Sequence, residues 1–186
     1  LEKYESDIAT WVGELYLELH RGTLTTHALV KRQNRKLEWK LHSVEMLWSC
    51  LPIDDYPGKD LDRMWKTLLI NQFHDIIPGS SIGLVYENTH KEYEKLHADC
   101  NSLIERSSKR LFKKDQNSMV LVNTLSYRWS GSVRIPESFH GYELFDNQNR
   151  SIPLQMVGED VLALVELAPL SFTTLKRGDA LLMDNE

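Results

Sequence analysis

The spacing of apolar residues changes near residue 115 of this chain. Before that point, apolar residues recur every three or four positions, which is typical of amphipathic helices that bury one face. After it, short apolar or alternating runs are separated by Gly, Pro, Asn and Asp, which is typical of antiparallel strands and turns. The pattern predicts the α+β fold class, with an antiparallel three-helix bundle followed by a partial antiparallel β-sandwich segment.

Three stretches have helical spacing, and they cover residues 26–51, 60–74 and 82–111. Prolines and glycines lie between them, and long helices with short connections are typical of antiparallel bundles. The positions expected in the helical core are Val30, Leu37, Leu41, Val44, Trp48, Leu51, Leu61, Met64, Trp65, Leu68, Leu69, Ile82, Val85, Thr89, Tyr93, Leu96, Cys100, Leu103 and Leu111.

The second part of the chain contains six predicted strands. They cover residues 119–122, 131–135, 142–145, 152–157, 161–165 and 172–175. We expect two domains: residues 1–114 form the bundle with an extended N-terminal segment, and residues 115–186 form the start of a β-sandwich domain. A sandwich usually takes about 100 residues, so we expect the second domain to be truncated. The absence of an initial Met agrees with a piece of a longer chain.

Charge and composition exclude several classes of protein. Apolar residues make up 41% of the chain and charged residues 26%, as in ordinary globular proteins. Residues 1–114 carry 17 basic and 17 acidic side chains and residues 115–186 carry 5 and 10, so the net charge of −5 lies in the second part. Neither part has the clustered positive charge that nucleic acids require. No apolar run reaches the roughly 18 residues of a membrane span. We therefore expect neither nucleic acid nor a membrane as a partner.

Two smaller features concern the helical part. Lys31, Arg32, Arg35, Lys36 and Lys40 form a basic stripe, which we interpret as a solvent-exposed helix face. The two cysteines, Cys50 and Cys100, fall at predicted core positions. Buried reduced thiols are the usual state of such cysteines, which favours a reducing compartment and a cytoplasmic location.

Most histidines lie in the helical part, so we considered metal sites. His90, Glu94 and His97 share one face of the third predicted helix, but that face borders its apolar stripe, where polar residues are common without a metal. His74 and Asp75 are better candidates because they precede a tight loop. The imidazole can bind zinc, and the carboxylate can orient it, bind the same ion or accept a hydroxyl. The alternative is that both residues only end the helix.

Polar groups are also dense in residues 11–26, just before the first predicted helix. Glu14, Glu18, His20 and Arg21 place hydrogen-bond donors and acceptors together, which suits the recognition of sugar hydroxyls. The alternative is an extended segment that packs on the bundle with its charges in solvent. The residues alone favour neither.

Two of these stretches resemble a known family. Residues 11–26 (WVGELYLELHRGTLTT) and 71–82 (NQFHDIIPGSSI) are similar to the class II α-mannosidases, glycoside hydrolase family 38, and most of all to the cytosolic and vacuolar branch with its bacterial relatives. The resemblance continues into residues 121–129 (LVNTLSYRW), which are similar to the start of that family's β region. It implies that an N-terminal β/α domain and further β-sandwich domains lie outside this chain.

The resemblance also implies a chemistry. The family comprises zinc-dependent retaining hydrolases, in which a carboxylate attacks the anomeric carbon. His74 matches the histidine that the bundle contributes to zinc, Asp75 matches the acid that contacts the sugar, and His20 matches a position lining the mannose site. Leu24 and His27 depart from the family pattern at the edge of that site. The nucleophile and the other zinc ligands belong to the N-terminal domain, so we expect no catalytic residue here.

We therefore expect a fragment of a zinc-dependent α-mannosidase that hydrolyses terminal α-mannosyl residues and is inactive alone. The cofactor would be Zn²⁺, with Co²⁺ as a substitute, completed by ligands outside the chain. The expected partners are a mannose-containing oligosaccharide and the N-terminal β/α and C-terminal β domains of the same chain. Whether the longer protein forms a homo-oligomer is left open. Two alternatives are a non-catalytic carbohydrate-binding module and a structural helical or β module.

Overall fold

A computed structural model describes residues 10–13 and 22–180 of the chain. Three helices are followed by two antiparallel sheets, which confirms the predicted α+β class. The helices are α1 (Ala28–Ser49), α2 (Gly58–Asn71) and α3 (Gly83–Leu111), with the short 3₁₀ helices η3 (Ile53–Asp55) and η4 (Glu137–Phe139). The strands are β1 (Ser118–Asn123), β2 (Trp129–Arg134), β3 (Tyr142–Phe145), β4 (Leu154–Val157), β5 (Asp160–Leu167) and β6 (Ser171–Ala180).

The chain forms two compact units. Among the described residues, the first contains 10–13, 22–41 and 58–100, and the second contains 42–57 and 101–180. Since α1 and α3 each contribute to both units, this division does not coincide with the predicted boundary after residue 114. That boundary between a helical and a β domain stays a prediction.

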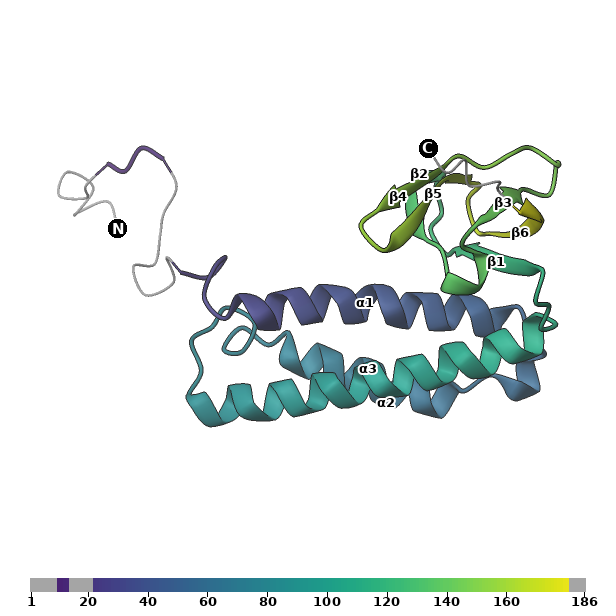
Figure 1. The fold of residues 1–186 in the computed structure, drawn as a ribbon. Coiled ribbons are helices and arrows are strands. Elements are labelled where there is room, and N and C mark those ends of the chain that lie inside the picture. Colours follow the sequence, from purple (N-terminus) through teal and green to yellow (C-terminus); the bar gives the residue numbers. More distant parts are fainter. Residues whose placement is uncertain (1–9, 14–21, 181–186) are drawn as a thin grey trace, which may run out of the picture. The chain divides into compact units, whose positions relative to one another are not determined.

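In the first unit, α2 runs antiparallel to the parts of α1 and α3 beside it (Figure 1). Arg63, near the start of α2, pairs with Asp99 of α3 at 2.9 Å, whereas Asn71, at the end of α2, accepts a hydrogen bond from Thr89 earlier in α3. The unit buries one apolar row of each helix, as the spacing predicts. The buried apolar residues are Val30, Leu37, Leu41, Leu61, Met64, Leu68, Tyr86, Tyr93, Leu96 and Cys100.

Two predicted core positions of this unit are wrong. Leu69 is 55% exposed, because it lies one residue beyond the buried Leu68 and therefore about 100° further around α2. Ile82 is 69% exposed, because it precedes α3, which begins at Gly83. Leu69 lies near the end of α2, and Ile82 lies in the connection between α2 and α3.

The second unit contains two three-stranded sheets, with the strand orders β1-β6-β3 and β2-β5-β4. All neighbouring strands are antiparallel. Alternate residues of β5 face the core, which is the period expected of a strand with one buried face. The core residues of the β part are Ile135, Phe139, Leu144, Val161, Ala163, Val165, Leu167 and Leu175.

The third stretch with family resemblance, residues 121–129, contains Asn123, whose side-chain amide holds a loop of the second unit. The side-chain nitrogen of the buried Asn123 donates to the carbonyls of Tyr127 at 2.9 Å and Ala168 at 2.8 Å. Its side-chain oxygen accepts from the backbone N–H of Leu125 at 3.0 Å. Asn123 therefore links the β1–β2 connection to the connection between β5 and β6.

The two cysteines have different surroundings. Cys100 is buried, and this burial raises the pKa of its thiol to about 11. Cys50 follows the end of α1 and is exposed, so its prediction as a core residue is wrong. Both are free thiols. Across residues 10–13 and 22–180, none of the helices has the length and apolar content needed to cross a membrane.

Candidate functional site

His74 and Asp75 lie in a turn after α2, not at the end of a longer helix. The helix ends at Asn71, three residues earlier than expected, because its last turn tightens: the N–H of Gln72 donates to Leu69 and that of Phe73 to Ile70. The side chains of His74 and Asp75 are 77% and 61% exposed. Their Nε2 and Oδ2 atoms are 3.7 Å apart, so the predicted pair is brought together at the surface.

The imidazole of His74 packs on one aromatic neighbour. The rings of Phe73 and His74 have centroids 4.1 Å apart and are tilted by 40°. Within residues 10–13 and 22–180, no three His, Cys, Asp or Glu side chains gather as a metal site would require. Since zinc usually takes about four ligands, His74 and Asp75 supply only part of such a site.

The turn that carries these residues is closed by its own backbone. The N–H groups of Ile76 and Ile77 both donate to the carbonyl of Phe73, at 2.8 and 3.1 Å. The hydroxyl of Tyr86 in α3 donates to the carbonyl of Ile76 at 3.2 Å and accepts from the N–H of Ser81 at 3.0 Å. One tyrosine therefore joins the two halves of the loop over residues 72–82.

Asn71 fixes the end of α2 to α3. Its side-chain nitrogen donates to Glu92 Oε2 at 2.6 Å and to the carbonyl of Thr67 at 3.0 Å, and its oxygen accepts from the hydroxyl of Thr89 at 2.7 Å. Asn71 is 2% exposed and Thr89 is 1% exposed. Buried and fully bonded polar groups of this kind specify one arrangement of neighbouring helices.

Gln72 fixes the same helix end to α1. Its side-chain nitrogen donates to Glu38 Oε1 at 2.8 Å and to Asn34 Oδ1 at 3.1 Å. The residues immediately before Phe73 and His74 thus bind two different helices. We call these two links, from Asn71 to α3 and from Gln72 to α1, the helix-end braces.

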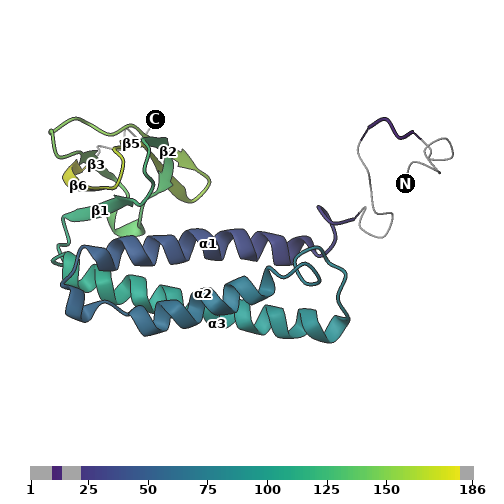
Figure 2. The same ribbon diagram turned by 180° about the vertical axis from the view of Figure 1, so that it is seen from behind.

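Residues 22–27, before α1, pack against the loop over residues 72–82, as both ribbon views show (Figures 1 and 2). A Cβ atom on Gly79 would lie 2.6 Å from Thr26 Cγ2, which measures how closely the two segments approach. His27 has a φ of 51° and stacks on Tyr86 with ring centroids 3.6 Å apart. Leu24, at the position where the family pattern differs, is 87% exposed.

The predicted sugar-binding residue His20 lies outside the described residues. The same holds for Glu14, Glu18 and Arg21. The role assigned to them stays a prediction, and the described part of the candidate site consists of His74, Asp75 and the residues that hold their loop.

The second histidine cluster has an explanation without metal. His97 Nε2 is 2.8 Å from Gln33 Oε1, and its Nδ1 is 3.3 Å from Lys40 Nζ. Burial lowers the pKa of His97, and the charges of Lys40 and Lys36 lower it further. A neutral imidazole bonded on both nitrogens links α1 and α3, as expected for a polar residue at the edge of a helix interface.

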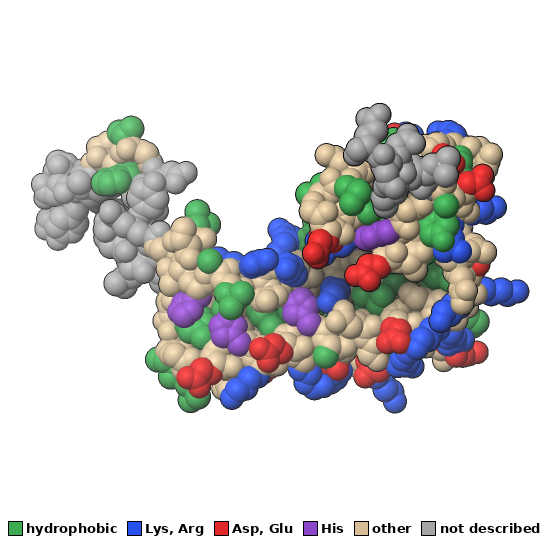
Figure 3. Space-filling model, viewed as in Figure 1, with side chains coloured by type: hydrophobic (Ala, Val, Ile, Leu, Met, Phe, Trp, Pro, Cys, Tyr) green, Lys and Arg blue, Asp and Glu red, His purple; other side chains and the backbone are tan. Residues whose placement is uncertain are grey.

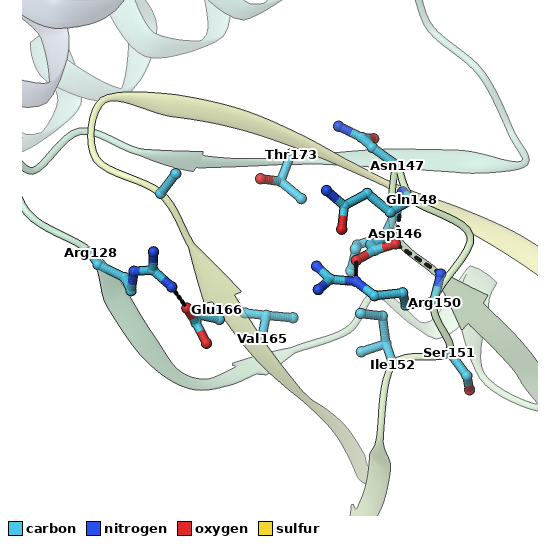
Figure 4. A pocket seen from close by; sticks show the side chains of 12 residues that line it. Arg128, Asp146, Asn147, Gln148, Arg150, Ser151, Ile152, Val165, Glu166 and Thr173 are labelled. Atoms are coloured by element: carbon cyan, nitrogen blue, oxygen red, sulfur yellow. Dashed lines mark hydrogen bonds and ion pairs between the residues drawn. The ribbon is translucent and has the colours of Figure 1, made fainter.

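A hollow of about 610 Å³ lies in the β part of the second unit (Figure 4). Its floor includes the buried Val165 and Leu175. On its rim, Arg128 pairs with Glu166, and Arg150 Nε pairs with Asp146 Oδ2 at 2.7 Å. These four charges are partnered with one another. Among the described residues no aromatic ring lines the hollow, so these residues offer a sugar no stacking surface there.

Apolar side chains are exposed close to the candidate loop. Ile70 and Phe73 are 65% and 54% exposed, and Leu84 at the start of α3 is 61% exposed. Figure 3 shows hydrophobic and histidine side chains close together on one face of the helical part. Exposed apolar groups beside polar ones are common where a protein meets a ligand or another domain.

The sequence predicts His74 and Asp75 as candidate residues but does not predict the residues that hold their loop. Asn71 and Gln72 stand directly before them, and helical spacing places Asn71 in the same row as Leu61, Met64 and Leu68. A polar residue in an apolar row was the available indication of a buried hydrogen-bonded group. Lys31 was assigned to a solvent-exposed stripe, yet it is only partly exposed and binds two backbone carbonyls.

Comparison with known proteins adds independent findings. Residues 18–111 match the family described as Alpha mannosidase middle domain. The chain is 37% identical over 150 residues to Alpha-mannosidase 2C1 of Mus musculus, which covers 77% of this chain. It is 44% identical over 109 residues to Alpha-mannosidase G of Dictyostelium discoideum, which covers 58% of this chain. The chain spans only 14% and 10% of the length of these relatives.

Solved structures show the same fold. A crystal structure of an α-mannosidase from Enterococcus faecalis V583 superposes with a TM-score of 0.62 at 19% identity, covering 89% of this chain and 25% of that one. A second, of a glycosyl hydrolase family 38 protein from Enterococcus faecalis, gives 0.65 at 18% identity and covers 100% of this chain and 28% of that one. At this level of identity the agreement concerns the fold alone.

Proposed function

The chain belongs to the class II α-mannosidases of glycoside hydrolase family 38, whose middle domain it matches, and from this membership we propose that it supplies one zinc ligand and part of the sugar site of a retaining α-mannosidase. The enzyme would hydrolyse terminal α-mannosyl residues of oligosaccharides. Its nucleophile would come from outside this chain, and the chain alone would be inactive.

The observation that carries this proposal is the placement of His74. Its side chain is 77% exposed, and its loop is tied to α1 and α3 by the helix-end braces and to α3 by Tyr86. An exposed imidazole on a well-held loop is available to an ion that other parts of the enzyme also bind. A histidine that only ended a helix would need no such support.

The donor set fits the proposed metal. An imidazole nitrogen and a neighbouring carboxylate oxygen are ligands that Zn²⁺ accepts, and Co²⁺ accepts the same types. His74 would bind the ion, and Asp75 would orient the imidazole or accept a hydroxyl of mannose. When bound, the ion would polarise sugar oxygens as a Lewis acid.

The proposed partners follow from the same reasoning. Donors and acceptors at Asp75 and His20 would bind a mannose-containing oligosaccharide, and the exposed Ile70 and Phe73 would pack against the N-terminal β/α domain. C-terminal β domains of the same chain would complete the sheets. Two free thiols favour a reducing, cytoplasmic location.

The test is His74→Ala in an α-mannosidase that contains this chain. We expect the variant to lose both bound zinc, measured by atomic absorption after gel filtration, and hydrolysis of an aryl α-mannoside. His90→Ala, another histidine of the helical part, is the matched control and should retain both. If His74→Ala keeps its zinc, the metal role is wrong. If mannose binding survives both His74→Ala and a chelator, the chain is instead a carbohydrate-binding module.

A further inference from the structure

Lys31 binds two backbone carbonyls on two different segments. Its Nζ atom donates to the carbonyl oxygen of Thr26 at 2.5 Å and to that of Ile77 at 2.8 Å. Thr26 belongs to the segment before α1, and Ile77 belongs to the loop that carries His74. A single ammonium group on the first turns of α1 therefore joins the two segments.

This use of a lysine differs from that of its neighbours in the basic stripe. Surface lysines usually remain hydrated or pair with carboxylates, and they contribute little to stability. Lys31 is partly buried, and that burial lowers its pKa. Charge-assisted hydrogen bonds to carbonyl oxygens are stronger than neutral ones and offset the loss of water.

The bond to Ile77 reaches His74 through a short path. The N–H of Ile77 donates to the carbonyl of Phe73 at 3.1 Å, and Phe73 directly precedes His74. Phe73 also packs its ring on the imidazole. The position of Ile77 therefore restricts the backbone of Phe73, the residue beside the candidate ligand, and the ring of Phe73 in turn contacts the imidazole.

Two further contacts show that the same two segments are closely packed. Thr26 lies against Gly79 so closely that a Cβ atom there would be 3.1 Å from the Thr26 carbonyl oxygen. His27 keeps a left-handed backbone while its ring stacks on Tyr86, which itself bonds to both halves of the loop. Strained backbone of this kind persists where the surrounding structure holds it.

We propose that Lys31 is a positioning residue for the His74 loop: by binding the carbonyls of Thr26 and Ile77, it holds the imidazole of His74 in the arrangement that binds metal. This inference rests on the proposed function, because it concerns the same metal. Residues that orient a metal ligand without touching the ion typically change metal affinity by about 10- to 100-fold when they are replaced.

The experiment uses an α-mannosidase that contains this chain and compares Lys31→Met, Lys31→Arg and Arg32→Met. Zinc affinity is measured by competition with a fluorescent chelator, and thermal unfolding is measured on the metal-free proteins. We expect Lys31→Met to bind zinc about tenfold more weakly or worse. Lys31→Arg should recover most of the affinity, because a guanidinium can donate to both carbonyls, and Arg32→Met on the same helix should match the unchanged enzyme.

Each outcome decides between the two proposals. Zinc affinity of Lys31→Met within twofold of the unchanged enzyme would overturn the role of Lys31, provided that His74→Ala loses its zinc. If His74→Ala keeps its zinc, the proposed function fails instead. A loss of affinity that Lys31→Arg does not restore, together with a lower unfolding temperature, would make Lys31 merely structural. Should Lys31→Met fail to fold, Lys31→Gln, which keeps a donor without the charge, replaces it in the same comparison.

Discussion

At Gly79 the backbone has a φ of +95°, and a Cβ atom placed there would lie 2.6 Å from Thr26 Cγ2 and 3.1 Å from the Thr26 carbonyl oxygen. Residues with a Cβ atom rarely adopt this backbone conformation, and the Thr26 atoms would have to move to accept one. Gly83, by contrast, is the first residue of α3 and has nothing within 4 Å of a Cβ position. Gly79 and Gly83 therefore provide a test position and a control position for the same substitution, close together in the chain.

We predict that Gly79→Ala lowers the free energy of unfolding by about 1–3 kcal/mol, through backbone strain and through the contact with Thr26. Gly83→Ala should leave the free energy unchanged or raise it slightly, because alanine favours helix more than glycine does. Urea denaturation of the two variants followed by circular dichroism checks the difference. Equal stabilities would show that the junction between residues 22–27 and the His74 loop is looser than described.

At the scale of single residues, the roles of His74 and Asp75 stay predictions, whereas the contacts of Lys31 differ from the predicted exposed stripe. The sequence indicates His74 and Asp75 as candidates because they precede a Pro-Gly loop and because the stretch over residues 71–82 resembles a known family. The contacts of Lys31 could not be predicted, because a lysine at helical spacing among other basic residues looks the same in sequence whether it is hydrated or bonded to carbonyls. A hydrated lysine and a bonded one differ only in whether backbone carbonyls lie within reach, and here the segment over residues 22–27 and the loop over residues 72–82 supply them.

Among the secondary-structure elements, α1 and α3 are linked by a neutral histidine. His97 of α3 contacts Gln33 and Lys40 of α1. Its pKa is lowered first by burial and then by Lys40 and Lys36. A lowered pKa means that the unfolded chain takes up the proton before the folded chain does. The contribution of neutral His97 to stability is therefore complete above the unfolded pKa of about 6.5 and is lost as the pH falls below it.

We predict that His97→Gln makes the free energy of unfolding less dependent on pH between about 7.5 and 5.5, since glutamine keeps hydrogen-bonding atoms but does not titrate in this range. Urea denaturation at several pH values, on both proteins in the same buffer series, measures this. Parallel curves for the two proteins would contradict the role of His97 at the α1–α3 interface.

The elements themselves were predictable, but their ends were not. A period of three to four predicts all three helices, and alternating or apolar runs predict all six strands, because most of these elements bury one face at least in part. The end of α2 depended on two i→i+3 bonds and on the braces from Asn71 and Gln72, which periodicity does not encode. As a result, the predicted second helix was three residues too long and placed His74 on a helix.

For the molecule as a whole, the described residues hold too few ligands for a metal. Within those residues no group of three His, Cys, Asp or Glu side chains could hold an ion. Affinity for zinc depends on about four ligands in fixed geometry, so His74 and Asp75 alone should bind it weakly.

We predict that the isolated 186-residue chain binds no stoichiometric zinc at neutral pH and does not hydrolyse an aryl α-mannoside. Isothermal titration calorimetry with zinc chloride and a colorimetric assay check the two parts, with a longer α-mannosidase as the positive control. One tightly bound zinc per chain, or measurable hydrolysis, would mean that this chain holds a more complete site than the proposed function assigns to it.

The family could be inferred from sequence because two separated motifs occur in the right order. The complete site could not, since the chain spans 14% of the length of Alpha-mannosidase 2C1 of Mus musculus. The proposed nucleophile and remaining ligands are expected outside this chain. His20 and its acidic neighbours stay predictions for a related reason, because they lie outside the described residues.

Because of the helix-end braces, the residues over 71–75 have two different roles. Asn71 and Gln72 are used by the helix packing, whereas the side chains of His74 and Asp75 are exposed and are the proposed ligand and sugar contact. A relative without the proposed metal site would still need the first two to pack its helices. Similarity over this stretch therefore indicates common ancestry more reliably than common activity, and we expect a relative that keeps Asn-Gln but has replaced His-Asp to have the same helix packing without the proposed metal site.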